Sequence, residues 1–294
     1  MSVATHTSVV TPRRPPPQVR RRRLLYAIGN HAIAITLSLM FLIPLFVVVV
    51  TALMSRSQVG TGQLLPDPVY LGNFSKVLTQ IPFVRYLGNT VIYATLATIG
   101  VVASSIPVAY AFSRLRWKGR DAVFVLVLAT MMLPAQVTSV SLYIVFTRLD
   151  WVGTLLPLIV PAFFGDAFTI FLLRQFFMTI PQELSEAARI DGASELTILR
   201  KVVIPLAKPA IAAVALFQFL YAWNDFYNPL LYTGNSSSNM TLAVGLTQFT
   251  TLAKGNAYEI QMAASLMFVI PVIIIFFFAQ KVFIEGVTLT GVKG

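Results

Sequence analysis

The sequence predicts an all-α membrane protein, and three observations support this prediction. Of the 294 residues, 56% are hydrophobic and 11% are charged, a composition too apolar for a soluble globular domain. Several apolar stretches reach the roughly 20 residues that a helix needs to cross the hydrocarbon core of a bilayer. Basic residues gather in alternate connections between these stretches. We therefore expect a single transmembrane domain over residues 24–294.

The apolar stretches can be drawn as six helical spans. They cover residues 24–53, 87–113, 121–147, 152–174, 208–232 and 260–283. Prolines such as Pro44, Pro107 and Pro271 fall within or at the ends of these spans. Because each proline removes a helix hydrogen bond, we expect kinked helices. Small residues in the segment 94–105 allow close packing between helices.

The basic residues indicate the orientation of the chain. With the N-terminus inside, the tail, the segments 114–120 and 174–208 and the C-terminus hold seventeen of the 22 Lys and Arg residues. By the positive-inside rule, both termini are then cytoplasmic. Residues 1–23, rich in proline and arginine, are expected to form a disordered cytoplasmic tail before an uncleaved signal anchor. We attribute the net charge of +11 to topology rather than to nucleic acid binding.

Several kinds of chemistry are excluded by the residues that the sequence lacks. There are no cysteines, and His6 and His31 are the two histidines, so disulfides, thiolate metal sites and a histidine metal cluster are not expected. No Gly-x-x-x-x-Gly-Lys-Ser/Thr phosphate loop occurs, so this chain has no ATP site of the usual kind. Nearly every acidic residue lies in a loop. We therefore expect neither an enzyme nor a resident metal or cofactor.

The longest connection on the outside covers residues 54–86. Glycines and prolines between positions 60 and 68 prevent long helices in its first half. The following segment, 73–87, has apolar residues at helical spacing. We expect a short helix at the outer surface, which either contacts a partner or caps the helix bundle.

The stretch SEAARIDGASELTILRKVVIPL, residues 185–206, is a charged, alanine-rich interruption between two apolar spans. Its local chemistry predicts two short helices. Pro181 suits a first helical position, and Glu183 favours the positive end of the helix dipole. Gly192 supplies the stop. The first helix is therefore expected to cover about 182–191.

The second helix has its own start and stop signals. Ser194 is suited to cap its N-terminus, and Glu195 lies in its first turn. Arg200 and Lys201 lie in the last turn, where positive charge complements the helix dipole. Pro205 then closes the helix.

The two short helices are expected to use their faces differently. One face of the first helix carries Leu184, Ala187, Ala188 and Asp191. One side of the second helix carries Leu196, Leu199 and Val203, which we expect to pack on the bundle. The first helix would then project outward with a small surface that suits a groove in another protein. An ordinary amphipathic loop is the alternative.

Residues 186–194, EAARIDGAS, followed by VVIPLAKPAI, closely resemble the signature cytoplasmic loop in the membrane subunits of bacterial ABC importers. Further agreement occurs in YLGNTVIYATLA (86–97), AYAFSRLRWKGRD (109–121), FLLRQFFMTIPQELSEAARIDGAS (171–194), WNDFYNPL (223–230) and VKG (292–294). Together these segments are similar to the carbohydrate branch, specifically the shorter maltose-type permease subunit. The tail GVTLTGVKG departs from the family's glycine-alanine run, and the basic N-terminus has no counterpart in the family.

The resemblance implies a six-helix permease subunit with the type I ABC importer fold in a bacterial cell membrane. Its implied partners are a second, related permease, two cytoplasmic ATPase subunits that hold ATP and Mg, and an extracytoplasmic sugar-binding protein. In that family the loop, here 180–206, contains a coupling helix held in a groove of the ATPase. The implied contact residues are Glu186, Ala187, Ala188, Asp191 and Gly192. The resemblance also implies that Gly291 to Gly294 approach the ATPase pair.

Two acidic residues, Asp166 and Asp225, fall within spans or close to their outer ends, where a charge is costly unless it faces water or a partner. They are candidates for the translocation path. Trp223, Asn224 and Tyr227 flank Asp225, and polar groups beside aromatic faces are typical of sugar sites. The alternative is that Asp225 and Asn224 brace their helix against a neighbour.

The sequence allows an alternative hypothesis for the substrate and another for the energy source. A disaccharide such as maltose or trehalose is the leading hypothesis, and a glycerol phosphate ester is the alternative within the same family. An ion-coupled secondary transporter would instead predict inverted repeats and acidic or histidine relays in the middle of the membrane. The sequence shows no convincing repeat and few such residues.

Overall fold

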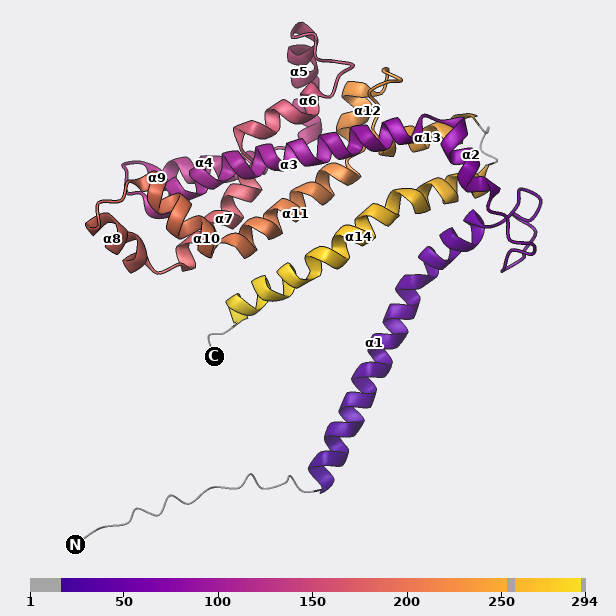
Figure 1. Cartoon of the computed structure of the whole chain (residues 1–294), viewed down its shortest axis with the longest axis horizontal. Coiled ribbons are helices and arrows are strands. Elements are labelled where there is room, and N and C mark those ends of the chain that lie inside the picture. Colours follow the sequence, from indigo (N-terminus) through magenta and orange to yellow (C-terminus); the bar gives the residue numbers. More distant parts are fainter. Residues whose placement is uncertain (1–16, 253–256, 292–294) are drawn as a thin grey trace.

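The computed structural model describes residues 17–252 and 257–291, with side chains described for 26–134, 136–247 and 257–277. Throughout that part of the chain, every regular element is a helix (Figure 1). The elements are α1 Pro17–Ala52, α2 Gly72–Gln80, α3 Phe83–Arg114, α4 Arg120–Thr130, α5 Ala135–Arg148, α6 Leu156–Ile159, η1 Val160–Phe164, α7 Ala167–Thr179, α8 Gln182–Ile190, α9 Glu195–Ile198, η2 Leu199–Val203, α10 Ile204–Leu206, α11 Lys208–Asn224, α12 Tyr227–Thr233, α13 Leu242–Leu252 and α14 Tyr258–Gly291. The predicted all-α fold is confirmed.

Four segments of the described chain are long and apolar enough to cross a bilayer. They are Tyr26–Ala52, Phe83–Arg114, Leu156–Thr179 and Tyr258–Phe277. A fifth is obtained if Glu195–Leu206 and Lys208–Asn224, bent by 80° at Ala207, are taken as one broken span. These segments support a multi-pass membrane protein. The count of six spans stays a prediction.

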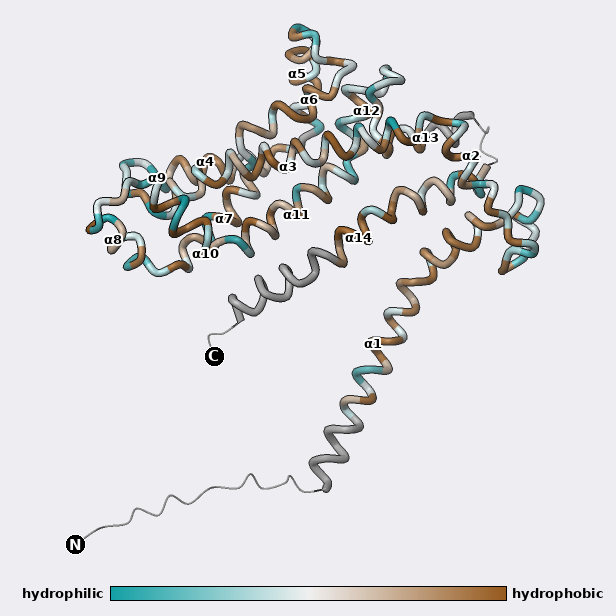
Figure 2. Tube along the Cα trace, in the orientation of Figure 1, coloured by the Kyte–Doolittle hydropathy of each residue, from teal (hydrophilic) through white to brown (hydrophobic). Residues whose placement is uncertain are grey.

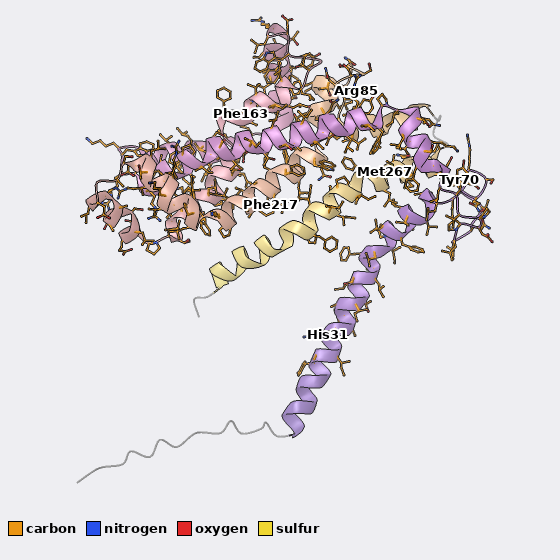
Figure 3. All side chains as sticks on the ribbon, in the orientation of Figure 1. His31, Tyr70, Arg85, Phe163, Phe217 and Met267 are labelled. Carbon is orange, nitrogen blue, oxygen red and sulfur yellow. The ribbon has the colours of Figure 1, made fainter. Side chains whose placement is uncertain are left out.

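The first long helix, α1, stands apart from the other helices over most of its length (Figure 1). Figure 2 shows that this helix is mostly hydrophobic. Its apolar side chains are exposed, as for Phe41 at 76%. His31 lies on this separated part of the helix (Figure 3). The prediction of a disordered tail through residue 23 was wrong for residues 17–23, because α1 already begins at Pro17. Proline suits the first helical turn, and arginine is a good helix former. The predictions for residues 1–16 and 292–294 lie outside the described residues.

Three of the predicted spans are interrupted. The range 152–174 consists of α6, η1 and α7, with a break before α7 begins at Ala167. The range 121–147 forms α4 and α5 rather than one helix, because Pro134 is the N-cap of α5 and restricts the residue before it. The range 208–232 is divided between α11 and α12 at Asp225, whose backbone is extended. Figure 1 shows α5 projecting from the bundle rather than continuing the line of α4.

The helix α3 is the central element, since α7 and α11 both pack along it. At Gly100 the chain of η1 comes so near to α3 that a Cβ atom would fall 2.7 Å from the ring of Phe163. Phe163 is labelled beside α3 in Figure 3. Only a glycine permits this approach without displacing that ring. The close packing predicted for the segment 94–105 is therefore confirmed at this position.

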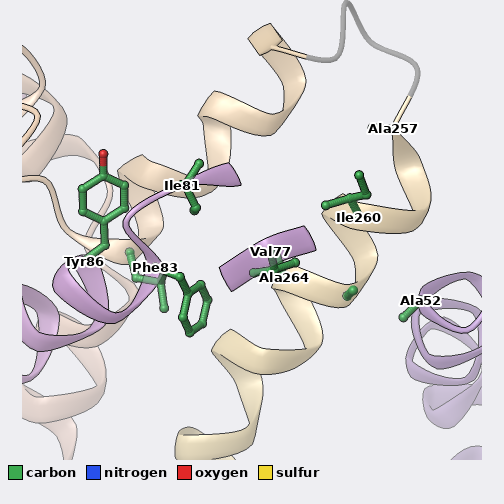
Figure 4. Packing of buried hydrophobic residues seen from close by; sticks show 10 residues of the cluster. Ala52, Val77, Ile81, Phe83, Tyr86, Ala257, Ile260 and Ala264 are labelled. Atoms are coloured by element: carbon green, nitrogen blue, oxygen red, sulfur yellow. The ribbon is translucent and has the colours of Figure 1, made fainter. Parts of the chain in front are cut away.

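The short helix α2 confirms the helix predicted after the turn-rich connection. Asn73 of α2 is fully buried and donates hydrogen bonds to the carbonyl oxygens of Ala52 and Met54, at 2.9 and 2.7 Å. Around it lies a buried apolar cluster from α1, α2, α3 and α14, shown in Figure 4. Its labelled members are Ala52, Val77, Ile81, Phe83, Tyr86, Ala257, Ile260 and Ala264. This cluster holds the end of the molecule that is opposite α8 (Figure 1).

Candidate functional site

The helix α8 forms where the local sequence predicts it. Pro181 is the N-cap rather than the first helical residue, and Glu183 lies in the first turn. At the other end the N–H of Gly192 donates to the Arg189 carbonyl at 3.0 Å, and the N–H of Ala193 donates to the Ala188 carbonyl at 2.9 Å. These are the two hydrogen bonds of a Schellman motif, and Gly192 has the left-handed φ of 81° that the motif requires. The predicted stop is confirmed.

One side of α8 is held against the bundle and the other faces outward. Ser185 is buried, and Ala188 and Ala193 pack against the inner cluster, a group of buried residues from α3, α7 and the segment after α8. The inner cluster consists of Ala109, Tyr110, Leu173, Phe177, Ile180, Ile198, Leu199, Val203, Ala207 and Val214. Of the residues implied to contact an ATPase, Ala188 is half-buried and the other four, Glu186, Ala187, Asp191 and Gly192, are exposed.

The second predicted helix is built differently from the prediction. Ser194 does cap it, since its Oγ accepts from the Thr197 N–H at 3.3 Å. However, α9 passes directly into the π-helix η2, and Leu196 is 55% exposed while Ile198 is fully buried. The prediction that Leu196 packs on the bundle was therefore wrong. The wider π turn departs from the 3.6-residue spacing on which that prediction rested.

Arg114, the last residue of α3, binds the segment that connects α7 to α8. The residue is 9% exposed, and its guanidinium donates from Nη2 to the carbonyl oxygens of Phe177 and Ile180 at 2.6 and 2.5 Å, with a longer contact of 3.5 Å from Nη1 to the Pro181 carbonyl. The carbonyls at a helix C-terminus lack partners within the helix and carry partial negative charge. A buried arginine there joins the ends of α3 and α7 to the start of α8. Sequence reasoning read Arg114 only as a topology signal.

A second tie joins α8, α9 and α3 through one carboxylate. Glu195 accepts from Arg189 Nε at 2.7 Å and from its second guanidinium nitrogen at 3.3 Å. Tyr110 of α3 donates its hydroxyl to the same carboxylate. The hydrogen bond from Arg189 holds the pKa of Glu195 below its ordinary value, against the opposing effect of burial. Because both ends of α8 are tied to α3, the helix follows the bundle.

The carboxylate of Asp225 lies where α11 breaks and is fully engaged with protein groups. It accepts from the Tyr93 hydroxyl at 2.8 Å, from the Asn228 N–H at 3.2 Å and from Asn228 Nδ2 at 3.0 Å. The bond to Tyr93 crosses from the α11–α12 junction to α3. This geometry favours the predicted alternative in which Asp225 braces its helix against a neighbour. Asn224 does not take part, because its Nδ2 donates to the Leu220 carbonyl of its own helix.

The aromatic residues beside Asp225 separate into different roles. Trp223 is 1% exposed and stacks on Phe219 and Phe268, so its ring has no free face for a sugar in this conformation. The prediction that Trp223 lines the translocation path stays a prediction, and the burial of the ring does not favour it in this conformation. Tyr227 is 41% exposed, and its hydroxyl lies 3.0 Å from Ser139 Oγ of α5.

Asp166 borders a cavity of about 760 Å³ between α3, α4, the η1–α7 segment and α11. Its carboxylate caps α7 by accepting from the Thr169 N–H at 2.7 Å. The polar residues in the lining are Tyr93, Asp166, Thr169, Gln218 and Tyr221, and Phe168 and Phe217 add aromatic rings. A neighbouring cavity of about 510 Å³ includes Tyr93 and Asn228. Gln218 and Tyr221 were not predicted, although both lie on the span that leads to Asp225.

The comparison with protein families identifies the family to which this chain belongs. Residues 99–288 match the family described as the inner membrane component of binding-protein-dependent transport systems. The chain belongs to this family. The matched segment contains α8, Asp166 and Asp225. The predicted identity as an importer permease is confirmed. The family members are transport subunits, so the absence of a catalytic cluster from the sequence agrees with the family.

Two individual relatives are named as permease proteins of transport systems, and a solved ABC transporter also matches. The arabinooligosaccharides transport system permease protein of Halalkalibacterium halodurans is 36% identical over 230 residues, which cover 78% of this chain and 81% of the relative. The sn-glycerol-3-phosphate transport system permease protein of Yersinia pestis is 33% identical over 264 residues, covering 87% and 94%. A solved bacterial ABC transporter that imports the acidic polysaccharide alginate matches with a TM-score of 0.75 and 28% identity, covering 92% and 99%.

The Glu195 tie should depend on pH. A carboxyl whose pKa is lower in the folded chain contributes stability above its ordinary pKa, and this contribution is lost as pH falls through the folded value. We expect Glu195→Gln to lower Tm near pH 7 by the equivalent of less than about 1 kcal/mol, because the pair is partly exposed. The difference from wild type should be smaller at about pH 3 than near pH 7, as measured by thermal unfolding of the purified permease.

Glu186→Gln is the matched control for this measurement, because Glu186 is an exposed carboxylate on the neighbouring helix α8. It should leave Tm nearly unchanged at both pH values. A Tm difference for Glu195→Gln that is equal at both pH values would contradict the role assigned to its charge.

Proposed function

We propose that this chain is one permease subunit of an ATP-driven importer for sugars and that α8 transmits the movement of a separate ATPase to the helix bundle. The observation that carries the proposal is the construction of α8: its outer face is free, and both of its ends are fastened to α3. Four exposed residues, Glu186, Ala187, Asp191 and Gly192, form that outer face with the apolar side chains of Leu184 and Ile190. Ile190 is 86% exposed, which suits a groove in another protein.

The orientation proposed for the permease has both termini in the cytoplasm of a bacterial cell. In Figure 1, α1 begins and α14 ends on the side of the molecule that is away from α2. The helix α8 lies on that same side. The excess of basic residues in the same connections supports a cytoplasmic position for this side. The segment around α2 would then face the outside, where a binding protein delivers the solute.

The assembly proposed around this chain contains three further kinds of subunit. They are a second, homologous permease, two copies of a cytoplasmic ATPase and an extracytoplasmic sugar-binding protein. The family's description as binding-protein-dependent supports the last of these. ATP and Mg would be held by the ATPase, since the permease sequence has no phosphate loop. Closure of the ATPase pair would draw the α8 helices of the two permeases together and turn the cavity outward.

The cavity beside Asp166 is the part of the translocation path that we assign to this subunit. Its hydroxyl, amide and carboxylate groups lie next to aromatic rings, and this combination suits a sugar, which presents hydroxyl groups and apolar C–H faces. Among the described residues, the lining contains Asp166 and neither lysine nor arginine. A neutral sugar such as a disaccharide is therefore favoured over a glycerol phosphate ester, which would be repelled by the carboxylate. The ester remains the second candidate because one relative carries that name.

Replacing Gly192 should separate ATP hydrolysis from transport. At φ 81° an alanine is strained by about 1–2 kcal/mol, so the end of α8 would shift away from its groove. In proteoliposomes with the complete importer, we expect Gly192→Ala to lower sugar uptake at least about tenfold while ATP hydrolysis continues.

Gly153→Ala is the matched control, since Gly153 has a φ of 88° and open space around it but lies in the turn between α5 and α6. It introduces similar strain at a distance from α8 and should keep uptake coupled to hydrolysis. Normal coupling in Gly192→Ala would overturn the function proposed for α8.

The cavity assignment is tested by shortening Gln218. Loss of one neutral hydrogen-bonding group should lower uptake of a radiolabelled disaccharide by about two- to tenfold in Gln218→Ala. Gln175→Ala, on the exposed side of α7, should leave uptake unchanged. Unlabelled glycerol 3-phosphate should not compete with the disaccharide. Effective competition by this ester, or equal uptake in both variants, would contradict the assignment.

A further inference from the structure

A small cavity lies beside the anchor of α8 and has no part in the proposed transport cycle. It has a volume of about 160 Å³ and is enclosed by the ends of α3 and α7 and the start of α4. A water molecule occupies about 30 Å³ of liquid, so the space holds roughly five waters. That is too small for a disaccharide and suits a single phosphate group.

The lining of this cavity is strongly positive. Arg114, Arg120 and Arg174 converge on it from three different helices, and Ser113 and Gln182 add neutral polar groups. The lining includes no acidic residue. Asp121 pairs with Arg120 at 3.0 Å, but its side chain is 76% exposed. Three guanidinium groups around one small space are expected to repel each other unless an anion lies between them.

The most buried of the three arginines has an unused donor. Arg114 is 9% exposed, and its Nε has no hydrogen-bond partner among the described residues, although Nη2 donates to the Phe177 and Ile180 carbonyls and Nη1 lies 3.5 Å from the Pro181 carbonyl. An unpaired buried donor on a charged group costs more than one on a neutral group. In Arg174, Nε donates to the Phe112 carbonyl at 3.3 Å, and the guanidinium lies over the ring of Phe124. The remaining N–H groups of this guanidinium can donate to an anion.

The surroundings of the cavity are typical of a membrane interface. Trp117, 41% exposed, lies in the connection between α3 and α4, and tryptophan is enriched at the level of the lipid headgroups. A second hollow of about 400 Å³ shares Arg120 with this cavity and is lined by Arg116, Trp117, Gly119, Arg120, Asp121 and Ala122. The outer face of α4 continues from there with exposed Val123 and Leu126, along which acyl chains can lie.

We propose that the cavity formed by Arg114, Arg120 and Arg174 binds the phosphate of an anionic phospholipid. The three guanidinium groups would hold the phosphate, and the chains would run along α4. Basic pockets between transmembrane helices on the cytoplasmic side have the chemistry to bind such headgroups. The choice of the inner leaflet rests on the orientation proposed above. Because Arg114 also fastens α8, a bound lipid stiffens the junction through which α8 follows the bundle.

Native mass spectrometry of the full-length permease tests this site, with phosphatidylglycerol and phosphatidylcholine titrated separately. We expect wild type to bind phosphatidylglycerol at least about tenfold more tightly than phosphatidylcholine. Arg174→Gln and Arg120→Gln should each weaken phosphatidylglycerol binding about tenfold, since each removes a charge-assisted contact. Arg200→Gln is the matched control, because it removes one exposed positive charge on the same side but outside the cavity.

Three results would overturn the proposal. They are equal binding of the two lipids, equal loss in Arg174→Gln and Arg200→Gln, and binding of inorganic phosphate without binding of phosphatidylglycerol. The last result would mean that the cavity takes a free anion rather than a lipid. Size-exclusion profiles matching wild type establish that each variant is folded. The measurement needs neither ATPase nor sugar, so its failure leaves the transport proposal untouched.

Discussion

The hydrogen bonds from Arg114 to the carbonyls at the end of α7 are the interaction on which the rest of the structure depends. They place a positive group where the helix dipole is negative, and they do so in a buried position. Without them the end of α7 would lie close to α3 with unsatisfied carbonyls. With them, α3, α7 and the start of α8 form one joint, and the tie between Tyr110 and Glu195 closes it on the other side.

This joint explains how a helix at one edge can act on cavities deeper in the bundle. The helix α3 carries Arg114 and Tyr110 at one end and Tyr93 further along, where Tyr93 holds Asp225 and borders both cavities. In the proposed function, a displacement of α8 would be passed to α3, the helix that lines the proposed sugar path. Packed helices tend to switch between two discrete arrangements rather than bend gradually, and in this way a small shift at one site becomes a large rearrangement elsewhere. The break at Asp225, which lies between the end of α11 at Asn224 and the start of α12 at Tyr227, is a point at which such a rearrangement would not have to bend a continuous helix.

Sequence reasoning succeeded where local chemistry determines structure. Pro181, Gly192 and Ser194 set the ends of α8 and α9 through signals carried by one or two residues. It failed where distant segments meet. The role of Arg114 depends on α7 arriving beside it, the burial of Trp223 depends on α14, and the exposure of Leu196 depends on a π turn that regular periodicity does not contain. Asp225 was found because a charge within a span needs a partner, but the identity of that partner, Tyr93, required the fold.

Crosslinking of α8 in the assembled importer tests the central claim most directly. The chain has no cysteine, so Ala187→Cys provides a unique attachment point on the outer face of α8 for a short photoactivated crosslinker. The account predicts a crosslink to the ATPase subunit, with a yield that changes when ATP is bound. Ser57→Cys, exposed in the loop before α2, should give no such product. Equal crosslinking from both positions, or none from Ala187→Cys in an importer that still transports, would contradict the account.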